Sequence, residues 1–256
     1  MKLDLTNESI YRGNLILINA AYPLQGEPEK EKRCSVLGQE DLEMVREAAK
    51  QLKALTEYVK IGKRLTGVSG YRSLQEQEKI FEESLEENGE EFTRKFVALP
   101  NHSEHQTGLA IDVAKFKKEI DFICPEFPYD GIFAKFRKEA ADFGFVERYP
   151  KNKEEITGIG AEPWHFRYVG TPHAKLMVQK NLVLEEYIQW MKQYDMIDNP
   201  LIVIDGGKQV MLGYVNEKDN REIVVPDGQK VEVSGNNVDG FIISVASDLQ
   251  ESVKSA

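Results

Sequence analysis

Residues 105–113 hold the pattern that most restricts how this chain can fold. Over Leu109–Val113, branched apolar residues alternate with Ala110 and Asp112, which is the period of a β-strand and not of a helix. Asp112 therefore lies on the face opposite to the branched side chains, beside the small Ala110. His105 precedes the strand, and Gly108 allows the chain to turn back toward it. The pattern predicts an imidazole and a carboxylate that meet across a tight turn.

A second segment, Glu162-Pro163-Trp164-His165, follows about fifty residues later. Pro163 disfavours helical backbone at Glu162 and has no N–H to donate. This segment therefore differs from the helical H-E-x-x-H arrangement, in which both ligands share one helix face. We expect a strand over 165–169, with Glu162 in a bend before it.

Together the two segments supply the side chains of a catalytic zinc site: three ligands, an open coordination position and a general base. His105, Asp112 and His165 are the predicted ligands, and Glu162 is the predicted base. Arg72 is the candidate cation for a developing oxyanion, because guanidinium stays charged. Arg72 alone is equally compatible with a structural salt bridge. Each of the others alone has a more commonplace explanation, and their occurrence together favours the metal site.

The bulk composition excludes several function classes. The chain has 256 residues, 41% hydrophobic and 30% charged, with a net charge of −10. This negative net charge makes binding to nucleic acids and to anionic membranes unfavourable, because both carry negative charge themselves. The first eight residues do not resemble a secretory signal, no run approaches the length of a spanning helix, and the two cysteines suggest no disulfide framework. We therefore expect a cytoplasmic protein; its oligomeric state is open, a homodimer included.

The residue pattern predicts an α+β fold with a central antiparallel sheet and helices, followed by a small all-β module. Predicted domains are 1–196, which holds the metal site, and 197–256. Ser73 and Glu76 form a predicted capping box for the helix that follows them. The other expected elements are strands at 15–19, 109–114 and 143–146, helices over 39–59, 74–87, 131–143 and 172–194, and five short β-rich runs after residue 199.

The chain resembles the zinc D,D-peptidases of vancomycin resistance. Their S-x-H-x-x-G-x-A-x-D motif is matched at Ser103, His105, Gly108, Ala110 and Asp112, their E-x-x-H motif at Glu162 and His165, and their G-Y-R-S segment at 70–73. The resemblance extends from about residue 15 to about residue 187. It is strongest to the bifunctional VanXY type, in the form found in VanG-type clusters.

The resemblance implies a Zn²⁺ cofactor with the ligands and base given above, and oxyanion support from Arg72. It also implies that Ser103 and Gln77 help to hold the peptide and that Trp164 forms a wall of the pocket. Ser69 stands where some relatives have an acid, so it bears on the choice between dipeptide and longer substrates. The implied activity is hydrolysis of D-Ala-D-Ala and removal of the terminal D-Ala from cytosolic muramyl pentapeptide precursors, which would contribute to vancomycin resistance.

Three alternatives stay open, one of which is a housekeeping cell-wall recycling enzyme of the same chemistry in a drug-sensitive host. A peptidoglycan endopeptidase of the L-Ala-D-Glu lysin type would share the metal motif. A non-catalytic protein that binds D-Ala termini would need the ligands but would have no use for Glu162 as a base.

Overall fold

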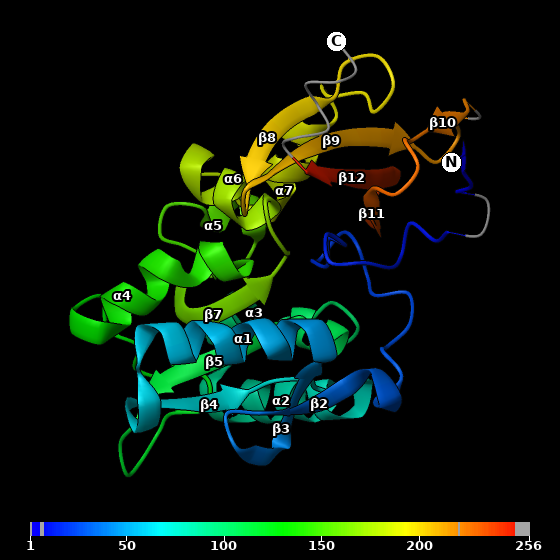
Figure 1. The fold of residues 1–256 in the computed structure, drawn as a ribbon. Coiled ribbons are helices and arrows are strands. Elements are labelled where there is room, and N and C mark those ends of the chain that lie inside the picture. Colours follow the sequence, from blue (N-terminus) through cyan, green and yellow to red (C-terminus); the bar gives the residue numbers. More distant parts are fainter. Residues whose placement is uncertain (1, 6–7, 220, 249–256) are drawn as a thin grey trace. The chain divides into compact units, whose positions relative to one another are not determined.

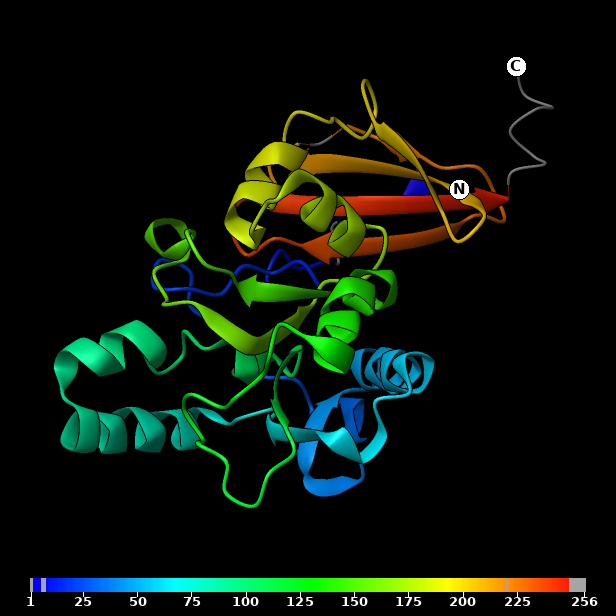
Figure 2. The same cartoon turned by 90° about the vertical axis from the view of Figure 1, so that its left-hand side faces the viewer.

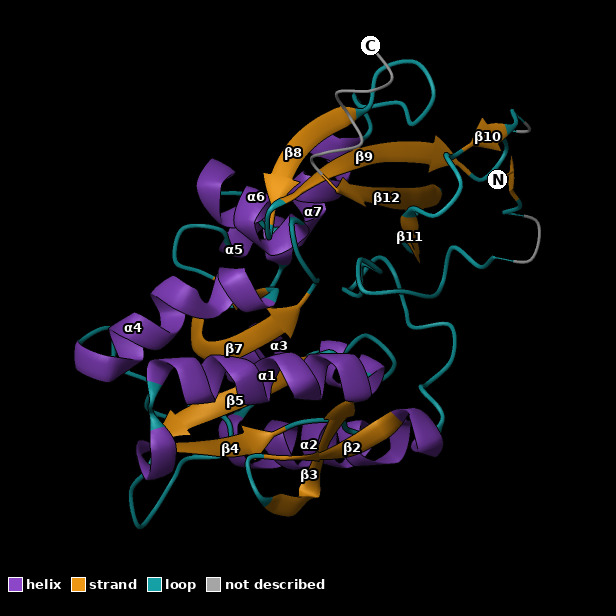
Figure 3. Ribbon diagram, viewed as in Figure 1, coloured by secondary structure: helices purple, strands orange, loops and turns teal. Residues whose placement is uncertain are grey.

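The structure is a computed structural model that describes residues 2–5, 8–219 and 221–248. By compactness the chain divides into two units, one of residues 18–183 and one that joins residues 1–17 to 184–256. Helices and strands mix in the larger unit, and strands dominate the smaller one (Figures 1 and 3). The predicted fold class, an α+β sheet with helices plus C-terminal strands, is confirmed. The predicted division into a catalytic domain that ends at residue 196 and a separate C-terminal module stays a prediction.

The larger unit is built on a four-stranded antiparallel sheet. Its strand order is β4 (Leu65–Ser69), β5 (Ala110–Lys115), β7 (Glu162–Tyr168) and β6 (Phe145–Tyr149). Both faces of β5 are buried, as expected for a central strand that is covered on both sides. The predicted strand at 109–114 is thereby confirmed.

Helices cover this sheet from two sides. The helix α1 (Arg46–Val59) lies on one side, and α2 (Leu74–Asn88) with α3 (Glu90–Phe96) lies on the other (Figures 1 and 2). An apolar core joins α1 and α4 (Gly131–Ala140) to the sheet. The remaining helices of this unit are α5 (Glu154–Thr157), α6 (His173–Lys180) and the 3-10 turns at Lys30–Lys32, Gly62–Arg64, Glu104–Thr107 and Ala141–Phe143.

The start of α2 follows the predicted capping box. The Ser73 side chain accepts a hydrogen bond from the Glu76 backbone N–H, and the Glu76 carboxylate accepts one from the Ser73 N–H. Two of the unpaired donors at the helix start are thereby satisfied. This helix begins directly after Arg72, so the cap also fixes the backbone that carries this guanidinium.

Three predicted elements differ from the structure. The predicted helix over 39–59 is a strand, β3 (Gln39–Val45), followed by α1, because Gln39–Val45 pairs with β2 (Arg33–Val36) in a hairpin. The predicted strand at 15–19 is irregular but buried. The predicted helix over 172–194 is two helices, because Asn181 takes a left-handed conformation at the end of α6.

The smaller unit confirms the expected β-rich runs. It contains β1 (Lys2–Leu3), α7 (Leu184–Met191), β8 (Leu201–Asp205), β9 (Lys208–Asn216), β10 (Ile223–Val224), β11 (Lys230–Gly235) and β12 (Gly240–Asp248). Four strands form an antiparallel sheet in the order β11-β12-β9-β8, and β10 pairs with β1 instead. A separate apolar core includes Phe241 and Ile243. Among the residues that the structure describes, no helix is long and apolar enough to span a bilayer.

Candidate metal centre and active site

The register of the central sheet brings three of the predicted site residues into one row. Asp112 on β5 lies opposite His165 on β7, and on its other side it pairs with Ser69 on β4. Directly opposite residues of antiparallel strands project from the same face. Residues far apart in the sequence are thus neighbours across the sheet. Glu162 begins β7 and does not lie in a bend before it, which corrects the sequence expectation.

His105 reaches this row from the short 3-10 turn Glu104–Thr107, which ends at Gly108 with φ +68°. A non-glycine residue would be strained in that left-handed conformation. The Nδ1 atom of His105 lies 2.7 Å from the carbonyl oxygen of Gly70. Because a carbonyl only accepts, Nδ1 carries the proton. The Nε2 atom of His105 then presents a lone pair to the site.

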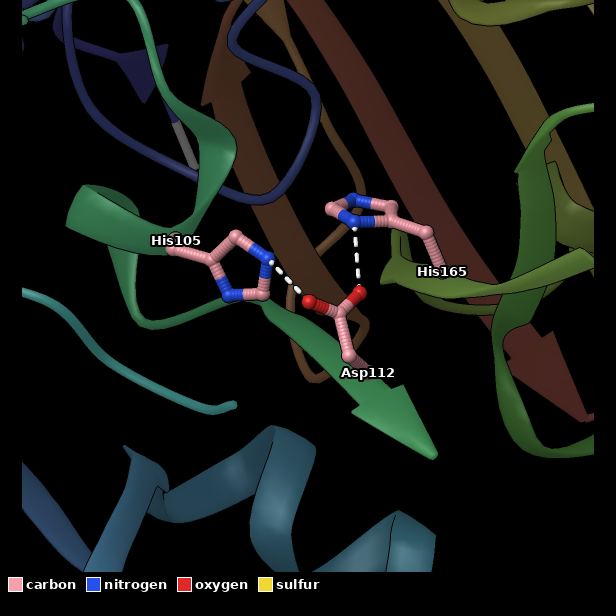
Figure 4. Close-up of side chains that lie close together, drawn as sticks. All are labelled: His105, Asp112 and His165. Atoms are coloured by element: carbon pink, nitrogen blue, oxygen red, sulfur yellow. Dashed lines mark ion pairs between the residues drawn. The ribbon is translucent and has the colours of Figure 1, made fainter. Parts of the chain in front are cut away.

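His105 and His165 flank the Asp112 carboxylate (Figure 4). The Nε2 of His105 is 3.0 Å from Oδ2 of Asp112, and the Nδ1 of His165 is 2.9 Å from Oδ1. One ligand atom from each of the three residues lies within 4.8 Å of the others, and all three side chains are buried. Two imidazoles and a carboxylate are the donor set that zinc prefers in catalytic sites.

The orientation of His105 fits a metal ion for a further reason. Burial lowers the pKa of His105, which favours the neutral ring. Its Nε2 lone pair then faces a carboxylate oxygen at 3.0 Å, and two acceptors at that distance repel each other. A cation shared by both atoms would remove this repulsion, so the residues present fit the metal that the ligand pattern predicts.

The site also shifts the pKa of the predicted base. Burial and, to a lesser extent, the Asp112 carboxylate raise the pKa of Glu162 to about 8, although His165 opposes the shift. The Oε2 of Glu162 lies 3.7 Å from Nδ1 of His165. A carboxyl whose pKa is close to neutral can both take and return a proton at physiological pH. For His165, burial favours the neutral ring, but Asp112 outweighs it and raises the pKa to about 9.

Arg72 is held beside the row by neighbouring polar groups. Its Nη1 donates to Oε1 of Gln77 at 2.8 Å and its Nη2 donates to Oγ of Ser69 at 2.7 Å. Gln77 is itself fixed, since its amide donates to the Ala98 carbonyl at 2.7 Å. The guanidinium ends 4.0 Å from Asp112. Ser69 and Gln77 therefore contact Arg72, and their predicted role in substrate binding stays a prediction.

A cleft of about 500 Å³, open space included, leads to these groups. Its lining includes Arg72, Ser103, Glu162 and Trp164 together with the three candidate ligands. The cleft is thus lined by the predicted ligands, base and cation and by two of the four predicted substrate contacts, Ser103 and Trp164.

Sequence reasoning missed a buried ionic cluster beside His165. The Oε1 of Glu104 is 2.8 Å from Nε of Arg148 and 2.8 Å from Nη1 of Arg167, and none of these side chains is exposed. Burial opposes ionisation, but the two guanidiniums hold the pKa of Glu104 well below its usual range. No local sequence pattern marks this cluster, because its three residues lie far apart in the chain and meet only in the folded sheet.

Comparison with known proteins identifies the family of the chain. The sequence model of the VanY family, described as D-alanyl-D-alanine carboxypeptidase, matches residues 41–171. A bifunctional D-Ala-D-Ala dipeptidase and carboxypeptidase of Enterococcus gallinarum, VanXYC, is 42% identical over 70% of this chain and 95% of its own length. The chain belongs to the VanY family.

Solved structures of similar proteins agree in fold. The vancomycin-resistance D,D-dipeptidase VanXYg, in complex with a phosphinate analogue of D-Ala-D-Ala, is 47% identical with a TM-score of 0.91. That match covers 96% of this chain and 98% of VanXYg. A mutant D,D-pentapeptidase VanY from a VanB-type cassette, in complex with Zn(II), is 30% identical with a TM-score of 0.56, over 68% of this chain and 98% of that one. The VanY family domain therefore occurs in this chain together with the extra C-terminal strands.

Proposed function

We propose that this VanY-family chain is a zinc-dependent D,D-peptidase that hydrolyses D-Ala-D-Ala and removes the terminal D-Ala from pentapeptide precursors of peptidoglycan. Such an enzyme would contribute to vancomycin resistance by destroying the D-Ala-D-Ala terminus. One observation carries the proposal. The side chains of His105, Asp112 and His165 converge as candidate ligands, and the Glu162 carboxylate lies beside them without being a predicted ligand. The VanXYg complex with a D-Ala-D-Ala analogue supports the choice of substrate. Action in the cytoplasm remains a prediction.

The residues divide the work of peptide hydrolysis between them. When bound, zinc supplies Lewis acidity, which polarises the scissile carbonyl and acidifies water. Glu162 takes a proton from the attacking water and returns it to the nitrogen of the leaving D-Ala. This is general acid–base catalysis, and it requires a carboxyl whose pKa lies near the working pH. Burial raises the pKa of Glu162 toward that range.

Arg72 contributes fixed positive charge. Because Ser69 and Gln77 hold its two terminal nitrogens, the guanidinium cannot reorient during the reaction. A fixed donor costs little reorganisation as negative charge develops on the carbonyl oxygen of the substrate. We assign Arg72 to that oxygen. The Ser103 hydroxyl and the Trp164 ring line the cleft and are assigned to the peptide.

The test measures D-Ala released by the zinc-loaded protein from D-Ala-D-Ala and, separately, from a muramyl pentapeptide ending in D-Ala-D-Ala. L-Ala-L-Ala is the stereochemical control, and the Glu162→Gln variant is the matched protein control. Release from both D,D substrates supports the bifunctional proposal. Release from only one restricts it to that substrate class. Zinc binding without release from either would overturn it.

The same assays separate two of the alternatives. Cleavage of an L-Ala-D-Glu bond in a muropeptide, with no D-Ala released from the D,D substrates, would favour the endopeptidase. Tight binding of D-Ala-D-Ala that is the same in wild-type protein and in Glu162→Gln, without turnover, would favour the binding protein.

A further inference from the structure

The two candidate histidine ligands face the site with opposite ring nitrogens. His105 presents Nε2 to Asp112, because its Nδ1 is bound to the Gly70 carbonyl. His165 presents Nδ1, which lies 2.9 Å from Asp112 and 3.7 Å from Glu162. A neutral imidazole ligates a metal through the nitrogen that carries no proton. His165 must therefore carry its proton on Nε2, on the side of the ring away from the site.

That side of His165 faces the Glu104 carboxylate. Its Nε2 lies 3.5 Å from Oε2 of Glu104, and neither atom has a hydrogen-bond partner among the residues that the structure describes. Both side chains are buried. A buried N–H and a buried carboxylate oxygen both require a partner, and the small closure needed to form a hydrogen bond would satisfy both.

The other oxygen of Glu104 explains why this carboxylate stays in place. Arg148 and Arg167 each lie 2.8 Å from Oε1. An isolated buried carboxylate would be too costly, but two guanidiniums on one oxygen compensate its charge. They also fix the orientation of the group, so that Oε2 points at His165.

We propose that Glu104 is the positioning residue of His165: its Oε2 accepts the Nε2 proton and thereby keeps the Nδ1 lone pair directed at the metal position. The proposal rests on the metal site of the proposed function. It adds a residue that is not a predicted ligand and that acts through the tautomer and orientation of one ligand, His165.

The test variant is Glu104→Gln, which keeps the size of the side chain. Its carbonyl oxygen can replace Oε1 toward the two arginines, which places the NH₂ group opposite Nε2 of His165. A donor there favours the tautomer with the proton on Nδ1, which blocks the ligand nitrogen. We expect zinc affinity, measured by chelator competition, to fall about 10–100-fold, the usual effect of losing a group that orients a ligand.

Nuclear magnetic resonance reads the tautomer directly. The chain has four histidines, so long-range ¹H–¹⁵N spectra of ¹⁵N-histidine protein can be assigned by single substitutions. In the zinc-loaded wild type we expect the proton of His105 on Nδ1 and that of His165 on Nε2. A His165 that carries its proton on Nδ1 would overturn the proposal, whether or not Glu104→Gln folds.

Arg148→Lys is the matched control. It weakens the same buried cluster at Oε1 and leaves Oε2 unchanged. We expect both variants to lower the melting temperature but only Glu104→Gln to weaken zinc binding. Equal zinc affinity in Glu104→Gln and wild type, or equal losses in both variants, would overturn the positioning role. A wild-type protein that binds no zinc would instead overturn the proposed function itself.

Discussion

The two units of the chain bury polar groups of different kinds. In the larger unit, buried side chains include charged and titratable groups: Glu104, His105, Asp112, Arg148, Glu162, His165 and Arg167. In the smaller unit, the buried polar side chains among the described residues are all uncharged: Ser234, Asn236, Asn237 and Ser244. The ion pairs of the smaller unit, such as those of Arg221 with Asp195 and Asp198, involve partly or fully exposed groups.

This difference assigns the chemistry to the larger unit, whereas the polar groups of the smaller unit contribute to stability. Buried ions cost desolvation free energy that a hydrophobic pair would not, and exposed ion pairs contribute little. The larger unit carries that cost around the candidate metal position, where the groups do chemical work. The smaller unit avoids it and relies on apolar packing and neutral hydrogen bonds. Substitutions of the candidate base and cation in the larger unit should therefore change activity more than stability, and substitutions in the smaller unit should do the reverse.

The largest effect is expected for Glu162→Gln. Loss of the acid–base group should lower kcat by roughly 10²–10⁴-fold, with zinc still bound. The free energy of unfolding should not fall, because the amide replaces a carboxyl whose burial raises its pKa to about 8. The measurements are D-Ala release, zinc content and urea unfolding. Glu155→Gln, the same change at an exposed residue, is the control. A normal kcat in Glu162→Gln would show that Glu162 does not take part in the reaction.

Arg72→Lys should have the next largest effect. A lysine keeps the charge but cannot reach both Ser69 and Gln77 with one planar group. We expect kcat to fall by about 10²-fold, near the usual loss for one oxyanion donor, while zinc affinity is retained. Steady-state kinetics on D-Ala-D-Ala and chelator competition measure the two quantities. Loss of zinc with the kcat per bound zinc unchanged would show that Arg72 supports the ligands instead.

In the smaller unit, Asn236→Ala should affect stability alone. The Asn236 side-chain oxygen accepts hydrogen bonds from the backbone N–H groups of Val238, Asp239 and Gly240. Alanine would leave these buried donors with fewer acceptors, at a cost of about 2 kcal/mol in the free energy of unfolding. We expect kcat to be unchanged.

Tryptophan fluorescence can assign that loss to the correct unit. Trp190 belongs to the smaller unit and Trp164 to the larger, so a Trp164→Phe background reports unfolding of the smaller unit. The exposed Asn199 provides a control, since Asn199→Ala should change stability by less than about 0.5 kcal/mol. A large fall in kcat for Asn236→Ala would show that activity also depends on the smaller unit.

The smallest effect is expected for Asp239→Asn. Burial opposes ionisation of Asp239, but hydrogen bonds from Lys192 and Asn236 hold its pKa below the usual value. A lowered folded-state pKa contributes stability above the unfolded pKa of about 4, and this stability is lost as the pH falls through the folded value. The variant should be about 1 kcal/mol less stable at pH 7, because the group is partly exposed. In urea unfolding across this pH range, the difference in stability between Asp239→Asn and wild type should vanish in acid. A difference that stays constant with pH would contradict this prediction.

Local patterns predicted the parts of the fold that local physics determines. The capping box at Ser73 and the alternation that gives β5 both depend on neighbouring residues, and both are confirmed. The hairpin strand Gln39–Val45 was missed because its apolar residues fit helical spacing as well, and only pairing with β2 decides between the two.

The candidate site shows the same limit. The ligand and base residues of the predicted centre can be recognised from residue type and spacing. The role of Glu104 can be recognised only from its partners on two strands. Arg167 alternates with aromatic residues and Arg148 follows Glu147, so both look solvent-facing in the sequence. Only the sheet register reveals that both converge on Glu104.

The proposed function requires that the buried ionisable groups of the larger unit form a metal site for peptide hydrolysis. The most direct test is a zinc titration of metal-free protein, with D-Ala release from D-Ala-D-Ala followed at each step and Asp112→Asn treated in parallel. We predict that release rises from the background level and saturates when each chain holds a single zinc ion, and that Asp112→Asn neither retains zinc nor gains activity. Full release by metal-free wild type, or by Asp112→Asn, would contradict this prediction.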